Sequence, residues 1–197
     1  MPVSPPEPPT SETHASSTPS NSNRMRKQSV LKRQLALTCI FAFLAAAAET
    51  LPVTPAETLS GQKLEFPTAA LGKPAIYVFG FSKAAGDKVK PWMARLSQDG
   101  LNCWSIANLE GAPSLVRGMI RGSMRKGTPE SLLDRSLVMT KDAKAWKQAL
   151  AVKQDSLPVA VLVDAKGYVL WTYEGVLAEE PYHELKTRFE NAAKAAH

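Results

Sequence analysis

Two places in this 197-residue chain combine residue types and spacings that suggest chemistry. The first is Lys83-Ala84-Ala85-Gly86, at the predicted start of a helix in which Pro91 stands eight positions after Lys83. A cysteine at such a helix start has a lowered thiol pKa and acts as the nucleophile of disulfide exchange. None of these four residues has a thiol, so the segment cannot perform that reaction. The second place is Cys103, the one cysteine that follows the first 50 residues.

Cys103 lies within a strand predicted over 101–107, not at a helix start. A lone thiol in an apolar strand is typical of a buried and inert core residue. We therefore expect Cys103 to be structural and the chain to be non-catalytic. The alternative is a redoxin-type thiol oxidoreductase that uses Cys103 together with an external thiol. Because Cys39 lies in the N-terminal apolar run, we expect no disulfide within the folded domain.

A third pattern is a basic stripe, in which Arg117, Arg121 and Arg125 follow one another at intervals of four residues. Four-residue spacing on a helix places them on one side. The helix is predicted over about 113–125 with Leu115, Val116, Met119, Ile120 and Met124 as its apolar set. A solvated face of an ordinary amphipathic helix explains the stripe. The functional interpretation is contact with an anionic membrane surface or with an acidic partner.

Other site types find little support in the sequence. His183 has no His, Cys or acidic residue at ligand spacing, so we predict no metal site. The sequence has no glycine-rich phosphate loop and no Ser-His-Asp set, and no cofactor is implied. The formal net charge is +6, but residues 1–48 hold five basic and two acidic side chains, which leaves +3 for 49–197. This balance argues against a nucleic-acid-binding protein.

The elements that must position these residues follow from apolar patterning. The run 75–81 is continuously apolar and rich in β-formers, which indicates a strand covered on both faces. The further strands are predicted at 101–107, 136–139, 159–164 and 168–173, and the helices at 83–98, about 113–125, 141–152 and about 179–195. This order predicts a three-layer α/β fold, with a central mixed sheet and helices on both faces.

The N-terminal residues have a different composition. Residues 1–24 are rich in Pro, Ser and Thr, and we expect disorder there, or an extension that precedes the true start at Met25. Residues 25–48 have basic side chains and then an uncharged apolar run over 35–48, as in a signal peptide. We therefore expect export to the periplasm or another extracytoplasmic location; an uncleaved inner-membrane anchor or an organellar transit peptide is the alternative. Residues 49–60 are expected to form an extended linker.

The motifs from Lys83 onward resemble the thioredoxin-like superfamily, particularly its exported redoxin-type members. Lys83-Ala84-Ala85-Gly86 stands where that family has its two-cysteine motif, and Pro91 matches its helix proline. Leu157-Pro158 is similar to the family's cis-proline segment, and Asp164-Ala165-Lys166-Gly167 to its hairpin. The resemblance spans about 60 to 195 and implies a thioredoxin-like domain at 61–197. The redox activity does not carry over, because the two cysteines are missing.

A narrower resemblance links residues 75 to 180 to the mitochondrial ATPase-complex assembly factor ten family. It rests on Leu115 and the basic turn after it, Leu137-Val138-Met139, Val161-Leu162-Val163-Asp164 and Trp171. That family is thioredoxin-like and binds a membrane subunit of the ATP synthase without turning over a substrate. The resemblance implies an assembly factor that binds protein.

A binding surface is also expected where the redox site would lie. Its residues are Lys83 and Gly86 at the helix start, Trp92 after the proline, and Pro158 in the later loop. Trp92 is expected to be partly exposed there, while the other tryptophans are core candidates. The predicted function is an exported, redox-inactive thioredoxin-like protein that binds a membrane-complex subunit through this surface or through the Arg117, Arg121 and Arg125 stripe.

Overall fold

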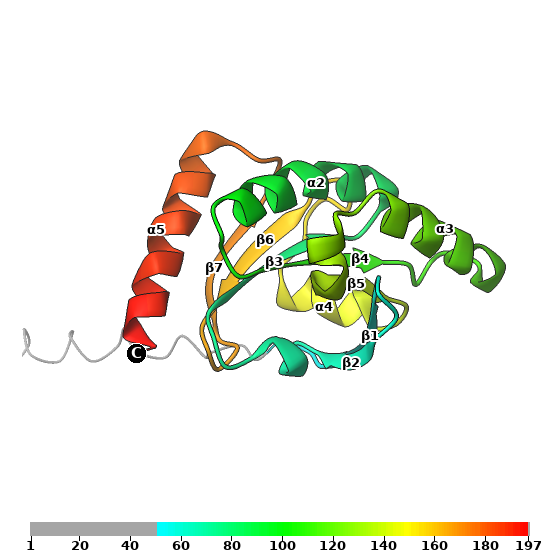
Figure 1. The fold of residues 1–197 in the computed structure, drawn as a ribbon, viewed down its shortest axis with the longest axis horizontal. Coiled ribbons are helices and arrows are strands. Elements are labelled where there is room, and N and C mark those ends of the chain that lie inside the picture. Colours follow the sequence, from blue (N-terminus) through cyan, green and yellow to red (C-terminus); the bar gives the residue numbers. More distant parts are fainter. Residues whose placement is uncertain (1–50, 197) are drawn as a thin grey trace, which may run out of the picture. The chain divides into compact units, whose positions relative to one another are not determined.

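The computed structural model describes residues 51–196 (Figure 1). These residues belong to one compact unit, Ala48–His197. The predictions for residues 1–24 and 25–48 lie outside the described residues. No helix in 51–196 is long and apolar enough to cross a membrane.

The strands of the described part form one mixed sheet of seven strands in the order β2-β1-β5-β4-β3-β6-β7. β3, β4 and β5 are parallel to one another, and the other neighbours pair antiparallel. The strands are β1 (Thr54–Thr58), β2 (Lys63–Phe66), β3 (Ala75–Gly80), β4 (Cys103–Asn108), β5 (Ser136–Met139), β6 (Val159–Val163) and β7 (Val169–Glu174).

Helices lie on both faces of this sheet, as predicted (Figure 1). α2 and α5 pack on one face, and α4 packs on the other. The helical elements are η1 (Thr68–Ala70), α2 (Lys83–Gln98), α3 (Ser114–Lys126), η2 (Glu130–Arg135), α4 (Ala143–Ala149) and α5 (Glu179–Ala195). The predicted α/β architecture is therefore confirmed, and the bounds of α2 are those expected from the sequence.

The core has two parts, separated by β3. All six residues of β3 are buried, and alternate side chains point to opposite faces. On the α4 face the core is aromatic, with ring centroids 4.8 Å apart for Phe66 and Tyr77 and 5.0 Å apart for Phe79 and Trp146. On the α2 and α5 face it is mostly aliphatic, with Trp92 at its centre. The continuous apolarity of 75–81 thus reflects burial on both faces.

The structure of residues 54–58 contradicts the predicted linker at 49–60. They form β1, an internal strand of the sheet that pairs with β2 and β5, and not a linker. The inward side chains are Thr54, Ala56 and Thr58, which are too small and polar to register as an apolar pattern. Pro55 is tolerated because the ladder to β5 begins only at Ala56. The domain therefore starts earlier than residue 61.

The end of β3 fixes the position of α2 through a close backbone contact. A Cβ atom at Gly80 would lie 3.2 Å from both the Cα and the amide nitrogen of Gly86. A Cβ atom at Gly86 would meet nothing within 4 Å. Gly80 is therefore required by packing, whereas Gly86 is not.

We expect opposite effects of alanine at these two glycines. Gly80→Ala forces β3 and α2 apart and is expected to lower the free energy of unfolding by about 1–3 kcal/mol, as overpacked cores do. Gly86→Ala is expected to be neutral or stabilising by up to about 1 kcal/mol, since alanine favours a helix. Urea denaturation of both variants measures the difference. Equal destabilisation would contradict the assigned contact.

Candidate functional site

The start of α2, where the sequence predicted a binding surface, is tied to the loop before β6. The Ser82 hydroxyl accepts a hydrogen bond from the Ala85 amide (3.2 Å), which makes Ser82 the N-cap. The same hydroxyl donates to the Asp155 carbonyl (2.7 Å). The Lys88 ammonium donates to the Ser156 carbonyl (2.9 Å). These bonds hold the helix start and the loop together directly, and the sequence did not indicate them.

Two of the residues predicted for this surface are buried, which corrects the prediction. Trp92 is fully buried, and its indole donates to the Gly175 carbonyl (3.2 Å). Pro158 is also buried, and its carbonyl accepts from the Gly175 amide (2.9 Å). The one cis peptide bond among the described residues precedes Pro67, so Leu157-Pro158 differs from the family's cis-proline. Only Lys83 of the predicted set has an exposed side chain here.

Cys103 lies in the core between the sheet and α2. It is 1% exposed and opposite Ile76 in the ladder of β3 and β4. Burial raises the pKa of its thiol to about 11, and the positive charge of Arg135 offsets this only in part. Very little thiolate, the reactive form, is therefore present near neutral pH.

The thiol of Cys103 is expected to be unreactive in the folded protein. At pH 8, a disulfide reagent should modify it more slowly than a free thiol by about two orders of magnitude or more, because the raised pKa and burial both oppose attack. Denatured protein should react fully, which controls for an oxidised thiol. A rate that levels off between pH 6 and 8 in the native protein would contradict this expectation, because a thiol with a pKa of about 11 keeps gaining thiolate throughout that range. The measurement is absorbance of the released thiol over time.

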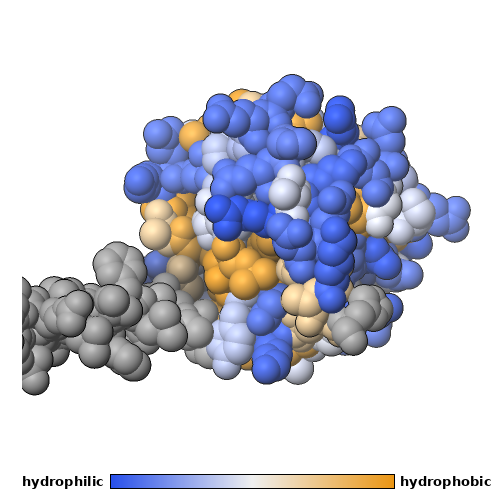
Figure 2. All heavy atoms as spheres, turned by 90° about the vertical axis from the view of Figure 1, so that its left-hand side faces the viewer, coloured by the Kyte–Doolittle hydropathy of each residue, from blue (hydrophilic) through white to orange (hydrophobic). Residues whose placement is uncertain are grey.

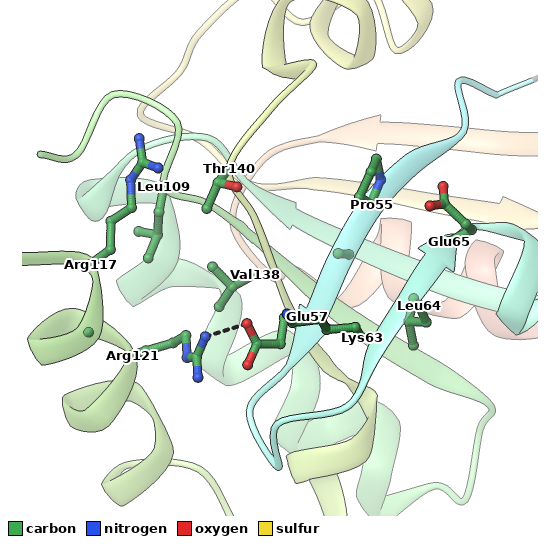
Figure 3. Close-up of a pocket in the computed structure, with 12 residues that line it drawn as sticks. Pro55, Glu57, Lys63, Leu64, Glu65, Leu109, Arg117, Arg121, Val138 and Thr140 are labelled. Atoms are coloured by element: carbon green, nitrogen blue, oxygen red, sulfur yellow. Dashed lines mark hydrogen bonds and ion pairs between the residues drawn. The ribbon is translucent and has the colours of Figure 1, made fainter. Parts of the chain in front are cut away.

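The three arginines of the predicted stripe have different surroundings in the structure. Arg117 turns back and donates to the carbonyls of Ala112 (2.8 Å) and Glu110 (3.0 Å). Arg121 forms an ion pair with Glu57 of β1 at 2.5 Å (Figure 3). Arg125 alone is exposed on the helix surface. The three guanidinium groups therefore do not form one free basic surface.

α3 has no buried residue, although it is an amphipathic helix. Val116, Ile120 and Met124 are half-buried on its inner side. Leu115 is 95% exposed and Met119 is 71% exposed, so they do not share the inner side as the sequence indicated. We call the exposed side around Leu115 the outer face of α3; it consists of Leu115, Gly118, Met119, Gly122 and Lys126. Gly118 lies at the edge of this face, where it also lines the groove beside β1. In Figure 1 the helix extends away from the sheet.

A groove of about 580 Å³ lies between α3 and the hairpin of β1 and β2 (Figure 3). Arg117, Gly118 and Arg121 line it from the helix. The sheet side consists of Pro55, Ala56, Glu57, Lys63, Leu64, Glu65, Leu109, Val138 and Thr140. The sequence does not indicate this groove, because its pattern predicts a linker where β1 lies. Its lining combines the ion pair of Arg121 and Glu57 with apolar side chains.

Other exposed apolar side chains lie on β7 and in segments next to it. Figure 2 shows this side of the molecule, with apolar atoms gathered among hydrophilic ones. Leu71, Tyr168, Leu170 and Val176 are 40%, 40%, 43% and 48% exposed. They are thus less exposed than the two large side chains of the outer face of α3. The described residues contain no group of three or more His, Cys, Asp or Glu side chains placed to hold a metal.

Comparisons with known proteins show the fold. No family model matches the sequence, and no curated protein matches it. BsSco, a member of the Sco family of cytochrome c oxidase assembly proteins, is 13% identical with a TM-score of 0.54, over 75% of this chain and 95% of its own. A SCO1/SenC family lipoprotein from Bacillus anthracis is 12% identical with a TM-score of 0.50, over 77% and 99%. The chain therefore has a thioredoxin-like redoxin fold, as predicted.

Proposed function

We propose that this chain is a non-catalytic, exported thioredoxin-like protein that binds another protein and acts in the assembly of a membrane complex of the ATP-synthase kind. The observation that carries the proposal is the outer face of α3, where Leu115 and Met119 are 95% and 71% exposed. A helix that contributes no buried residue to its own domain is free to contribute its apolar side chains to a complex.

The lack of an available thiol supports a binding role over an oxidoreductase. The start of α2 has Lys83 and Gly86 where a reactive cysteine would lie, and its polar groups bond to the loop before β6. Cys103 is buried and its thiol pKa is raised to about 11. A redoxin-type reaction at Cys103 would need this core to open around β4. We therefore keep it only as the competing function.

The assembly role is supported by resemblance. The segments around Leu137 and Trp171 resemble the ATPase-complex assembly factor ten family. BsSco is itself named as a member of a family of assembly proteins, and its likeness to this chain is one of fold. The export part of the proposal rests on residues 25–48, whose basic and apolar segments are typical of a signal peptide.

Complementation tests the function. In a source strain that lacks this chain, native gels and ATPase activity measure assembled ATP synthase. We expect Cys103→Ser to restore wild-type assembly. The double variant Leu115→Ser and Met119→Ser is expected to fail, because losing two apolar contacts of about 1.5–3 kcal/mol each weakens binding at least tenfold.

Leu170→Ser provides the matched control, since it also removes an exposed leucine but from β7. It is expected to restore assembly. Normal assembly without any copy of the chain would overturn the assembly role. Loss of assembly with Cys103→Ser, together with thiol turnover by the wild type, would establish the oxidoreductase instead.

A further inference from the structure

We infer that the outer face of α3 binds an acidic amphipathic helix of the partner protein, packed closely across Gly118 and Gly122. This inference rests on the proposed function and names the chemistry of the partner surface. Three features of α3 lead to it: its exposed apolar side chains, its glycines and its charge.

The apolar part of the outer face has helical spacing. Leu115 and Met119 are four residues apart and lie one turn from each other on the same side. Both side chains are accessible over most of their surface, so they can insert between the side chains of a second helix. A partner helix that packs here needs an apolar stripe of its own.

Neither glycine of the outer face is required by packing within the domain. A Cβ atom at Gly118 or at Gly122 would meet nothing within 4 Å. Alanine would favour the helix at both positions, because glycine is a poor helix former. Small residues four apart do, however, let a second helix approach closely, since the distance between helix axes depends on the side chains at the contact. A close partner explains why these positions lack side chains.

The positive charge of α3 favours an acidic partner. The helix has four basic residues, Arg117, Arg121, Arg125 and Lys126, and no acidic one. Glu57 pairs with Arg121, but Lys126 is exposed on the outer face and Arg125 is exposed beside it. Carboxylates on the facing helix would complement these two cations. Two copies of this chain that met through α3 would instead bring the same positive charges together. An anionic membrane would satisfy the charge but would give no reason for the two glycines.

Site-specific photocross-linking tests the inference in the full chain. Met119→p-benzoylphenylalanine places the probe on the outer face of α3, and Glu184→p-benzoylphenylalanine places it on an exposed position of α5 as the control. After irradiation of intact source cells, mass spectrometry identifies the adduct. We expect a position-119 adduct within an amphipathic helical segment of net negative charge, absent from the control. An adduct with lipid, with a second copy, or with a neutral or basic segment would overturn the inference, and so would no adduct.

Two double variants and one control variant, each combined with the probe at position 119, separate binding from folding. Gly118→Ala with Gly122→Ala is expected to lower the cross-link yield about tenfold, while the Tm stays the same or rises. Gly86→Ala on α2, which also has free space, is expected to leave the yield unchanged. Arg125→Glu with Lys126→Glu is expected to lower the yield about tenfold. An unchanged yield in either double variant would overturn the inference.

Failure of this inference is distinguishable from failure of the proposed function. If Leu115→Ser with Met119→Ser abolishes assembly but the adduct is lipid, the assembly role stands and the helical partner is wrong. If assembly of the ATP synthase does not depend on the chain at all, the proposed function itself is wrong.

Discussion

Burial of β3 on both faces is the constraint on which the rest of the structure depends. Each face of this strand is covered by a different part of the core, so the helices on either side are placed by the same six residues. At its end, Gly80 brings the backbone of α2 into contact, and this determines where the helix starts. The helix start that would hold redox cysteines is therefore formed, although it has no cysteine.

The two candidate binding surfaces differ in how they are held within the domain. The start of α2 is joined to the loop before β6 by hydrogen bonds from Ser82 and Lys88, and Trp92 and Pro158 lie inside. α3 is instead held at the side of the sheet by half-buried side chains and by the ion pair of Arg121 with Glu57. An ion pair as exposed as this one contributes at most about 1 kcal/mol.

The sequence was most informative where burial is continuous or strictly periodic. β3, α2, β5 and α5 were predicted at or near their observed bounds, because apolar residues outline them. β1 was missed because its buried side chains are two threonines and an alanine. The buried hydroxyl of Thr54 accepts a hydrogen bond from the indole of the distant Trp146 at 3.2 Å, which no local pattern shows. The groove beside β1 was therefore missed as well.

The sequence by itself determined the α/β class, the missing thiols at the start of α2 and the core position of Cys103. These follow from residue types and apolar runs, which act locally. Only the tertiary structure decided which polar side chains are hydrogen-bonded within the domain and which apolar side chains remain exposed. Arg117 and Arg121 find their acceptors in Glu110, Ala112 and Glu57. Leu115 and Met119 remain exposed, because a helix turns only its inner side to its own domain, and the domain decides which side that is.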